Sequence, residues 1–264
     1  MSVLRIVRRV GVVAIGFIVL SLSGAAAKES RMSLADTRDI VFAAPFSLPQ
    51  VSAAADEPFG LEVSAVVKGK LQEKWAGVKN ALPREASVLA RCRDNAEACT
   101  PAAKRFRAVI DKAASRTDWG RVAEVNRTIN LTIKAVDDVT QYGVRDLWAS
   151  PLMTFASGAG DCEDLAIAKY VALREIGIRG DDLRLVIVHD RSAKEDHAVA
   201  AIRYDGRWLI LDNKTSDIRD DTSIAQFDPL FVIDGDGVKS AEARTAKPQN
   251  PWMDSSIVTA RQFI

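Results

Sequence analysis

The stretch HAVAAIRYDGRWLILD, residues 197–212, decides which fold we expect for this chain. Two apolar runs flank the dipeptide Asp205-Gly206, which is typical of a two-residue turn between antiparallel strands. Residues 183–188 and 230–233 are also strand-like in composition. Four apolar stripes with helical spacing precede all these strands. Helices followed by antiparallel strands indicate an α+β fold.

The register of this hairpin brings two polar side chains together. If Asp205-Gly206 is the whole turn, Tyr204 pairs with Arg207, and His197 and Asp212 share one face as diagonal neighbours. Such neighbours lie about 7–8 Å apart at Cα, within reach of a hydrogen bond between imidazole and carboxylate. We therefore expect Asp212 to orient His197.

The chain has two histidines, so the choice of a general base is narrow. His189 ends the preceding strand and has no comparable partner except its neighbour Asp190. His197 is therefore the expected base. The alternative is a surface histidine, because the residues before it, 194–196, are typical of a solvated loop.

Cys162 is the expected nucleophile. It follows the glycine-rich turn 158–160 and opens a helix-like run that extends to Glu175, with Gly177 as the residue after its end. Unpaired N–H groups and the positive end of a helix dipole favour a thiolate there, and the same N–H groups can stabilise an oxyanion.

The acids beside Cys162 have two interpretations. Asp161 and Glu163 suit the first turn of a helix because carboxylates complement its dipole. However, carboxylates next to a thiol raise its pKa and oppose the thiolate. A Ca²⁺ ion shared by Asp161 and Glu163 would remove this conflict, since Ca²⁺ prefers oxygen ligands. Both interpretations stay open at this point.

Four helices are expected upstream. The first covers 61–81 and is ended by Pro83, and the second covers 84–91. The third begins at Pro101 with Thr100 as its N-cap, and the fourth lies around 122–133. A loop is expected from Asp137 to Gly160. It contains Trp148, which either packs, lines a substrate cleft or lends its indole N–H to an oxyanion.

The N-terminus predicts export. Arg5, Arg8 and Arg9 precede an apolar run over 10–22, and small residues end at Ala27, which together are typical of a cleaved signal peptide over 1–27. The apolar run is short for a membrane span, so no stable span is expected after cleavage. An uncleaved anchor helix is the alternative. An extended arm over 28–60 and one domain over 61–264, with its core at about 92–233, would follow.

Export implies an oxidising compartment, in which thiols tend to pair. Cys92 and Cys99 are close in sequence and are expected to form a local disulfide, although two unpaired buried cysteines are an alternative. Pairing them leaves Cys162 as a free thiol. The formal net charge of +1 gives no reason to expect nucleic acid as a partner.

Several of these residues together resemble a known family. Trp148, Pro151, the block GDCEDLAIAKY at 160–170, His197-Ala198-Val199 and Leu211-Asp212-Asn213 resemble the bacterial transglutaminase-like cysteine proteinases, in particular the LapG-type periplasmic branch. The resemblance covers about 92–233 and implies a papain-like, transglutaminase-like fold.

The resemblance also implies roles and partners. It implies a triad of Cys162, His197 and Asp212, and Ca²⁺ bound by Asp161 and Glu163. It implies a protein substrate, a large surface adhesin of the kind that supports biofilms, cut at a dialanine-type site. It further implies control by an inner-membrane receptor for cyclic-di-GMP.

Two other functions remain to be weighed. The same triad chemistry can transfer the acyl group to an amine, as in a transglutaminase or amidase, and the sequence does not separate this from proteolysis. A non-catalytic binding module with a vestigial triad is the other, and the intact Cys162, His197 and Asp212 argue against it.

Overall fold

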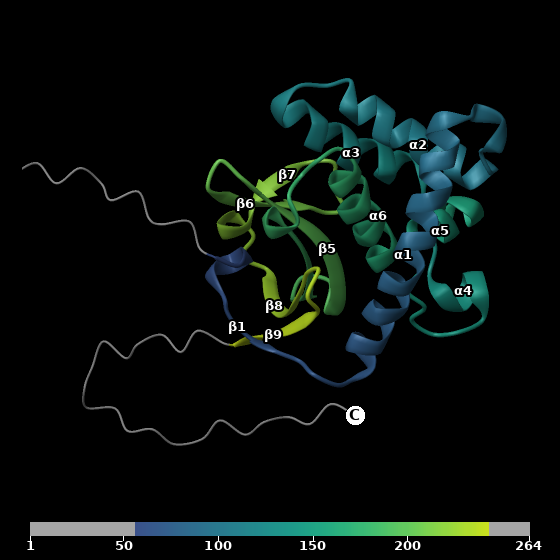
Figure 1. The fold of residues 1–264 in the computed structure, drawn as a ribbon. Coiled ribbons are helices and arrows are strands. Elements are labelled where there is room, and N and C mark those ends of the chain that lie inside the picture. The colour runs from purple at the N-terminus through teal and green to yellow at the C-terminus, as the bar shows by residue number, and fades with distance from the viewer. Residues whose placement is uncertain (1–55, 243–264) are drawn as a thin grey trace, which may run out of the picture. The chain divides into compact units, whose positions relative to one another are not determined.

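The computed structural model describes residues 56–242 (Figure 1). The expected signal peptide over 1–27, most of the expected arm over 28–60 and the residues after 242 lie outside this part of the chain. Within it, no helix has the length and apolar character needed to cross a membrane.

The first half of the described chain is mainly helical. Its elements are η1 (Pro58–Gly60), β1 (Glu62–Ala65), α1 (Lys70–Asp94), η2 (Ala96–Ala98), α2 (Pro101–Ala114), α3 (Asp118–Thr132), β2 (Lys134–Ala135), α4 (Asp138–Tyr142), α5 (Pro151–Ser157), β3 (Ala159–Gly160) and α6 (Cys162–Glu175).

The second half is mainly strands. Its elements are η3 (Gly180–Asp182), β4 (Leu183–Asp190), β5 (Glu195–Tyr204), β6 (Arg207–Leu211), β7 (Ile218–Asp220), η4 (Asp221–Ser223), β8 (Phe227–Ile233) and β9 (Val238–Glu242). Seven strands form an antiparallel sheet in the order β1-β9-β8-β4-β5-β6-β7. The expected α+β fold is confirmed.

The hairpin that decided the expectation has the expected register. Tyr204 pairs with Arg207, and the pairing continues without a shift to Ala200 opposite Leu211. Both central turn residues, Asp205 and Gly206, have positive φ, as a turn that matches the strand twist requires.

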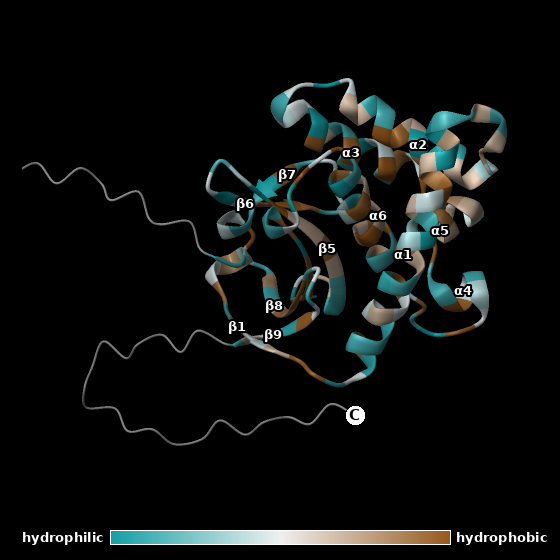
Figure 2. Ribbon diagram, viewed as in Figure 1, coloured by the Kyte–Doolittle hydropathy of each residue, from teal (hydrophilic) through white to brown (hydrophobic). Residues whose placement is uncertain are grey.

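Both faces of this sheet are buried. One face, including Leu185, Ala200 and Leu211, packs in the main core with helices α1, α2, α3 and α6. The other face carries a second apolar cluster around Trp208 and Ile210. Hydrophobic colouring is visible on α6 and on the central strands in Figure 2. Because both faces are covered, the central strands are apolar at nearly every position.

Helix α6 lies at the centre of the molecule. It packs against α2, α3 and α5 and against strands β4 and β5, and ten of its fourteen residues are buried. A helix that is apolar on most sides belongs in a core rather than on a surface. Its first residue, Cys162, is therefore held by a rigid element.

Three expected boundaries upstream are wrong. Pro83 does not end a helix but lies inside α1. The proline is exposed, so the carbonyl that loses its partner can bind water, and buried Trp75 and Leu89 hold the helix on both sides of it. The chain before Lys70 forms the edge strand β1 instead of a helix. The expected loop from Asp137 to Gly160 contains the short elements α4, α5 and β3.

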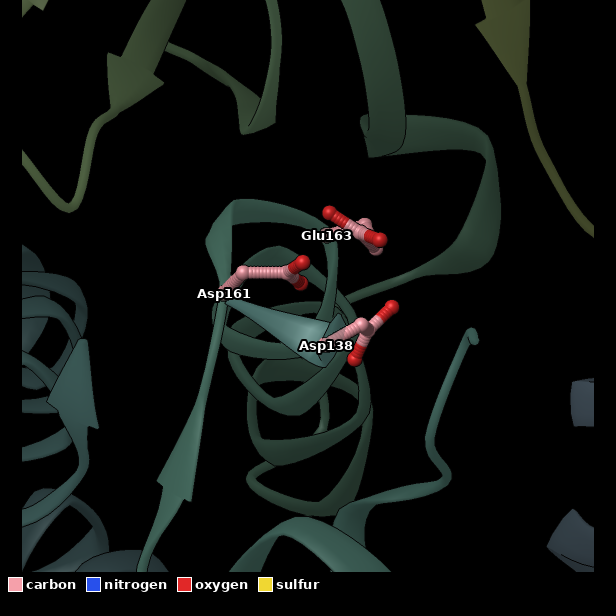
Figure 3. Close-up of side chains that lie close together, drawn as sticks. All are labelled: Asp138, Asp161 and Glu163. Carbon is pink, nitrogen blue, oxygen red and sulfur yellow. The ribbon is translucent and has the colours of Figure 1, made fainter. Parts of the chain in front are cut away.

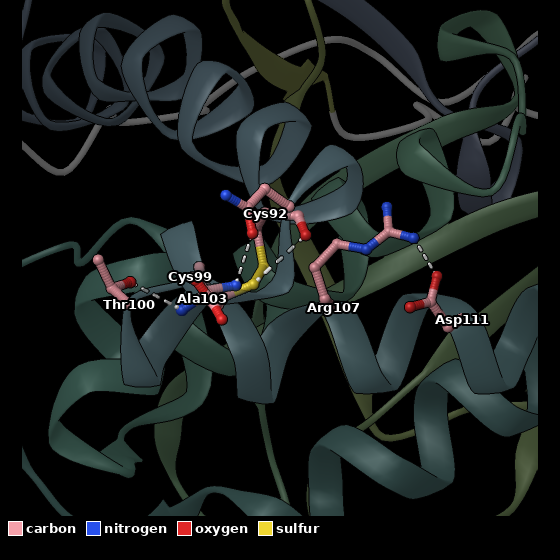
Figure 4. Close-up of a disulfide and its surroundings, with 8 residues drawn as sticks. Cys92, Cys99, Thr100, Ala103, Arg107 and Asp111 are labelled. Atoms are coloured by element: carbon pink, nitrogen blue, oxygen red, sulfur yellow. Dashed lines mark hydrogen bonds and ion pairs between the residues drawn. A yellow bond between two sulfur atoms is a disulfide. The ribbon is translucent and has the colours of Figure 1, made fainter.

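The other helices follow their sequence signals. Helix α2 begins at Pro101, and the side chain of Thr100 accepts a hydrogen bond from the Ala103 N–H (3.1 Å). Cys92 and Cys99 form the expected disulfide, which ties the end of α1 to the start of α2 (Figure 4). The disulfide lies outside the site that is described next, so its effect is on stability.

Candidate active site

Cys162 is the first residue of α6, and the chain enters the helix through a tight approach. A Cβ on Gly160 would lie 2.7 Å from the Asp164 Oδ2 atom, so a larger residue does not fit there. Asp164 is fully buried, and its Oδ1 accepts a hydrogen bond from the Ala149 N–H (2.7 Å). This contact joins the first turn of α6 to the segment that carries Trp148.

His197 and Asp212 meet as the register predicts. The His197 Nε2–H donates to Asp212 Oδ1 (2.8 Å), and both residues are almost completely buried. The same carboxylate oxygen accepts a second hydrogen bond from the Lys214 N–H (2.9 Å). Burial raises the pKa of Asp212, but its hydrogen bonds with His197 and Lys214 outweigh this, so the pKa lies below its usual value. Asp212 is thus held ionised against the imidazole.

His189 differs from the expectation. It has a carboxylate partner besides its neighbour Asp190, since its Nδ1 lies 2.9 Å from Asp196 Oδ1 on the adjacent strand. Both side chains of this pair are exposed, and His189 is not among the residues that line the cleft described next. The alternative of a surface histidine therefore fits His189 and not His197.

The cleft brings Cys162 and His197 together. A cavity of about 450 Å³ is lined by Cys162, His197, Ala198, Trp148, Asp161 and Glu163, among others. Cys162 is the single free cysteine of the chain, because the other two are paired. Trp148 contributes to the wall, and its indole N–H donates to Asp146 Oδ1 (3.2 Å). That donor is already engaged, which favours a packing role for Trp148.

The protein groups around Cys162 do not favour the thiolate by themselves. Burial raises the pKa of the thiol, and the negative charge of Glu163 raises it further, while the backbone N–H of Ala198 opposes both effects. The Cys162 thiol donates to Glu163 Oε2 (3.3 Å). This agrees with the expectation that carboxylates next to the thiol raise its pKa and oppose the effect of the helix terminus.

Three carboxylates gather next to the nucleophile. Asp138 joins Asp161 and Glu163, and ligand oxygens of the three lie within 4.8 Å of one another (Figure 3). Burial, and then the proximity of Glu163, raises the pKa of Asp161 to about 8. Asp138 Oδ1 and Asp161 Oδ1 are buried without a hydrogen-bond partner among the described residues.

These residues fit a bound cation. Buried carboxylates are stable when they are paired or ligate a metal, and two orphaned buried oxygens point to a missing positive partner. All donors in the cluster are hard carboxylate oxygens, which suit Ca²⁺ better than softer metals. Sequence analysis missed Asp138, which lies in the first turn of a five-residue helix, α4, within the segment that was expected to be a loop. The adjacent pair Asp137-Asp138 was the available signal.

Comparison with known proteins decides the family. A family model described as bacterial transglutaminase-like cysteine proteinase matches residues 83–225, which include Cys162, His197 and Asp212. The chain belongs to this family. It is accordingly a transglutaminase-like cysteine peptidase, and its substrate is a protein. No curated protein matches the chain.

Solved structures give the same fold. Legionella pneumophila LapG in an EGTA-treated form is 24% identical, with a TM-score of 0.50, and the match covers 61% of this chain and 87% of that chain. A calcium-bound form of the same protein is also 24% identical, with a TM-score of 0.49 and coverage of 59% and 87%. The likeness to the EGTA-treated form supports the transglutaminase-like fold.

Proposed function

We propose that this protein is a calcium-dependent cysteine endopeptidase that uses Cys162, His197 and Asp212 as its triad. The observation that carries the proposal is the 2.8 Å contact between buried His197 and Asp212 at a cleft lined by the free thiol of Cys162. A nucleophile, a base and a group that orients the base are what acyl transfer requires.

In the proposed reaction, His197 accepts the proton of Cys162 through the ring nitrogen that Asp212 does not occupy. The thiolate attacks a peptide carbonyl, and backbone N–H groups near Cys162 stabilise the oxyanion. His197 then protonates the leaving amine, so the C–N bond breaks and a thioester remains. Water activated by His197 hydrolyses the thioester and restores the thiol. Asp212 stabilises the imidazolium in each step.

We also propose that Asp138, Asp161 and Glu163 hold a Ca²⁺ ion. The calcium-bound form of Legionella pneumophila LapG supports this, together with the oxygen cluster of this chain. When bound, Ca²⁺ supplies positive charge beside the thiol. Without it, Glu163 both raises the pKa of Cys162 and accepts its hydrogen bond.

The cellular setting follows from the N-terminal signal and the resemblance. We propose a periplasmic enzyme, exported by residues 1–27, whose catalytic domain spans 61–264. Its proposed substrate is a surface adhesin that supports biofilms, and its proposed regulator is an inner-membrane receptor for cyclic-di-GMP. The cysteine pattern supports the compartment, because the disulfide between Cys92 and Cys99 is stable where the environment oxidises thiols.

The test compares surface proteins of cells that lack this chain after treatment with the purified protein or with Cys162→Ala, each with calcium or with EGTA. New protein N-termini are then identified by mass spectrometry. We expect specific cleavage only by the unsubstituted protein and only when calcium is present. Cleavage by Cys162→Ala would contradict the triad, and unchanged cleavage in EGTA would contradict the calcium proposal.

A labelled amine added to the same reactions distinguishes proteolysis from acyl transfer. Incorporation of the amine into glutamine side chains without new N-termini would contradict the endopeptidase and support a transglutaminase.

A further inference from the structure

The nucleophile helix carries a buried lysine that the proposed chemistry does not use. Lys169 lies two helical turns after Cys162 on α6 and is 0% exposed. Its Nζ donates to the Leu211 carbonyl (3.3 Å), inside the core. Leu211 is the last residue of β6, and Asp212 follows it directly. One side chain thus joins the helix of the nucleophile to the strand end that presents the carboxylate.

Within the described part of the chain, no ion pair offsets the free-energy cost of burying this lysine. No carboxylate oxygen of the described residues lies within 4.0 Å of its Nζ, which has a single acceptor. Burial of a charged group with so few partners costs free energy, and an apolar side chain of similar volume would be neutral or stabilising at such a position. Packing alone therefore gives no reason for a lysine here.

Lys169 and Asp212 nevertheless stabilise each other's charged forms. Burial lowers the pKa of Lys169 to about 7, and the negative charge of Asp212 opposes this. In return, the charge of Lys169 contributes to the lowered pKa of Asp212. The backbone of Asp212 is also anchored from α3, since the Asn130 side chain donates to the Asp212 backbone carbonyl (2.9 Å).

We propose that Lys169 is a positioning residue of this active site. Its side chain fixes the end of β6, next to Asp212, against the nucleophile helix. When protonated, it also places a positive charge near Asp212, which helps to hold the carboxylate ionised and aligned with His197. The inference rests on the proposed roles of Cys162, His197 and Asp212. Lys169 acts through Asp212 and does not contact the substrate.

The decisive readout is the imidazole itself. The chain has two histidines, so a protein labelled with nitrogen-15 histidine gives two rings in an NMR spectrum, and His189→Asn assigns them. We expect Lys169→Met to shift the ring signals of His197, including the Nε2–H signal, and to leave those of exposed His189 unchanged. Lys169→Gln keeps an N–H donor without the charge, and we expect the same shift from it.

The matched control is Leu173→Ala, one turn further along α6 and equally buried. It creates a cavity and destabilises the helix but leaves the strand end untouched. We expect unchanged His197 signals in this variant. Unchanged His197 signals in Lys169→Met or in Lys169→Gln would overturn the proposal, and so would an equal shift in Leu173→Ala.

Reactivity gives a second readout. Cys162 is the one free thiol, so iodoacetamide adds a single alkyl group to the protein, which mass spectrometry detects. We expect Lys169→Met to slow this alkylation at neutral pH by about tenfold, as for the loss of a charge that supports an ion pair, whereas Leu173→Ala retains the original rate. If His197→Ala slows the reaction but Lys169→Met does not, this inference fails and the triad stands. If neither variant slows it, the triad itself fails.

If both lysine variants fail to fold, a measurement on the unsubstituted protein tests the proposal instead. A nitrogen-15 lysine spectrum at mildly acidic pH is expected to show an ammonium signal protected from exchange with water. Its absence would overturn the proposal.

Discussion

Asp138→Asn should stabilise the calcium-free protein and reduce the further stabilisation that calcium provides. The substitution keeps the shape of the side chain and an oxygen that can accept the hydrogen bond from the Leu147 N–H. It removes one of three charges whose oxygens lie within 4.8 Å of one another. Two unit charges at that separation repel each other by about 3.5 kcal/mol at an effective dielectric constant of about 20.

Only part of this repulsion is present near neutral pH. The pKa of Asp161 is raised to about 8, so this carboxyl is mostly protonated without a cation, and Asp138 then faces mainly Glu163. Removal of the Asp138 charge should therefore stabilise the calcium-free fold by on the order of 3 kcal/mol. For a domain of this size, that raises the unfolding temperature by about 6–12 °C.

Calcium should remove most of this advantage. Saturation at about 100 times the dissociation constant stabilises a protein by about 2.7 kcal/mol, and Asp138→Asn should lose most of this gain because it lacks one ligand charge. Thermal unfolding in EGTA and in calcium measures both effects. Asp196→Asn is the matched control, since it removes the same charge from the cleft wall outside the cluster. A calcium shift in Asp138→Asn equal to that of the unsubstituted protein, or a lower unfolding temperature in EGTA, would refute the reasoning.

Three further predictions concern other parts of the molecule. Asp212→Asn should slow alkylation of the free thiol by about tenfold to a hundredfold, because a hydrogen bond between charged groups contributes about 1.5–3 kcal/mol; an unchanged rate would argue against an orienting role for Asp212. Replacement of Cys92 and Cys99 by alanine should lower the free energy of unfolding, measured in urea, by about 2.4 kcal/mol, which is the chain-entropy value for their separation of seven residues. The active site should stay intact, so a rate of Cys162 alkylation below half the original would contradict this prediction. Glu124 has a pKa lowered to about 2 by its hydrogen bonds with a lysine and a threonine, so it stabilises the fold above its unfolded pKa of about 4.5 and loses this effect as the pH falls towards 2; Glu124→Gln should therefore be more destabilising at pH 7 than at pH 3 in chemical denaturation, and an equal difference at both would exclude the charge as the cause.

Local signals in the sequence predicted those parts of the fold whose conformation is determined by interactions between residues close in sequence. Asp205-Gly206 allowed one hairpin register, and that register placed His197 beside Asp212. Thr100 and Pro101 marked a helix start because a cap and a fixed φ act within a few residues. The order of helices and strands then predicted the α+β class.

Elements that depend on distant contacts were not predictable in the same way. Pro83 costs a helix one hydrogen bond, and the apolar packing of α1 on both sides of it overrides that cost. Strand β1 is short and largely exposed, and it exists because it pairs with β9 at the far end of the chain. Asp138 reaches the nucleophile only through the fold, so the adjacent pair Asp137-Asp138 could not by itself show that Asp138 joins Asp161 and Glu163.

The most direct test of the account is the rate at which iodoacetamide alkylates Cys162 at neutral pH with calcium present. Activation by His197 should make this rate at least about tenfold faster than that of free cysteine, since it requires a thiol pKa about one unit or more below the ordinary value. His197→Ala should remove the advantage. A rate no faster than that of free cysteine, or one that His197→Ala leaves unchanged, would contradict the claim that these residues form a working catalytic site.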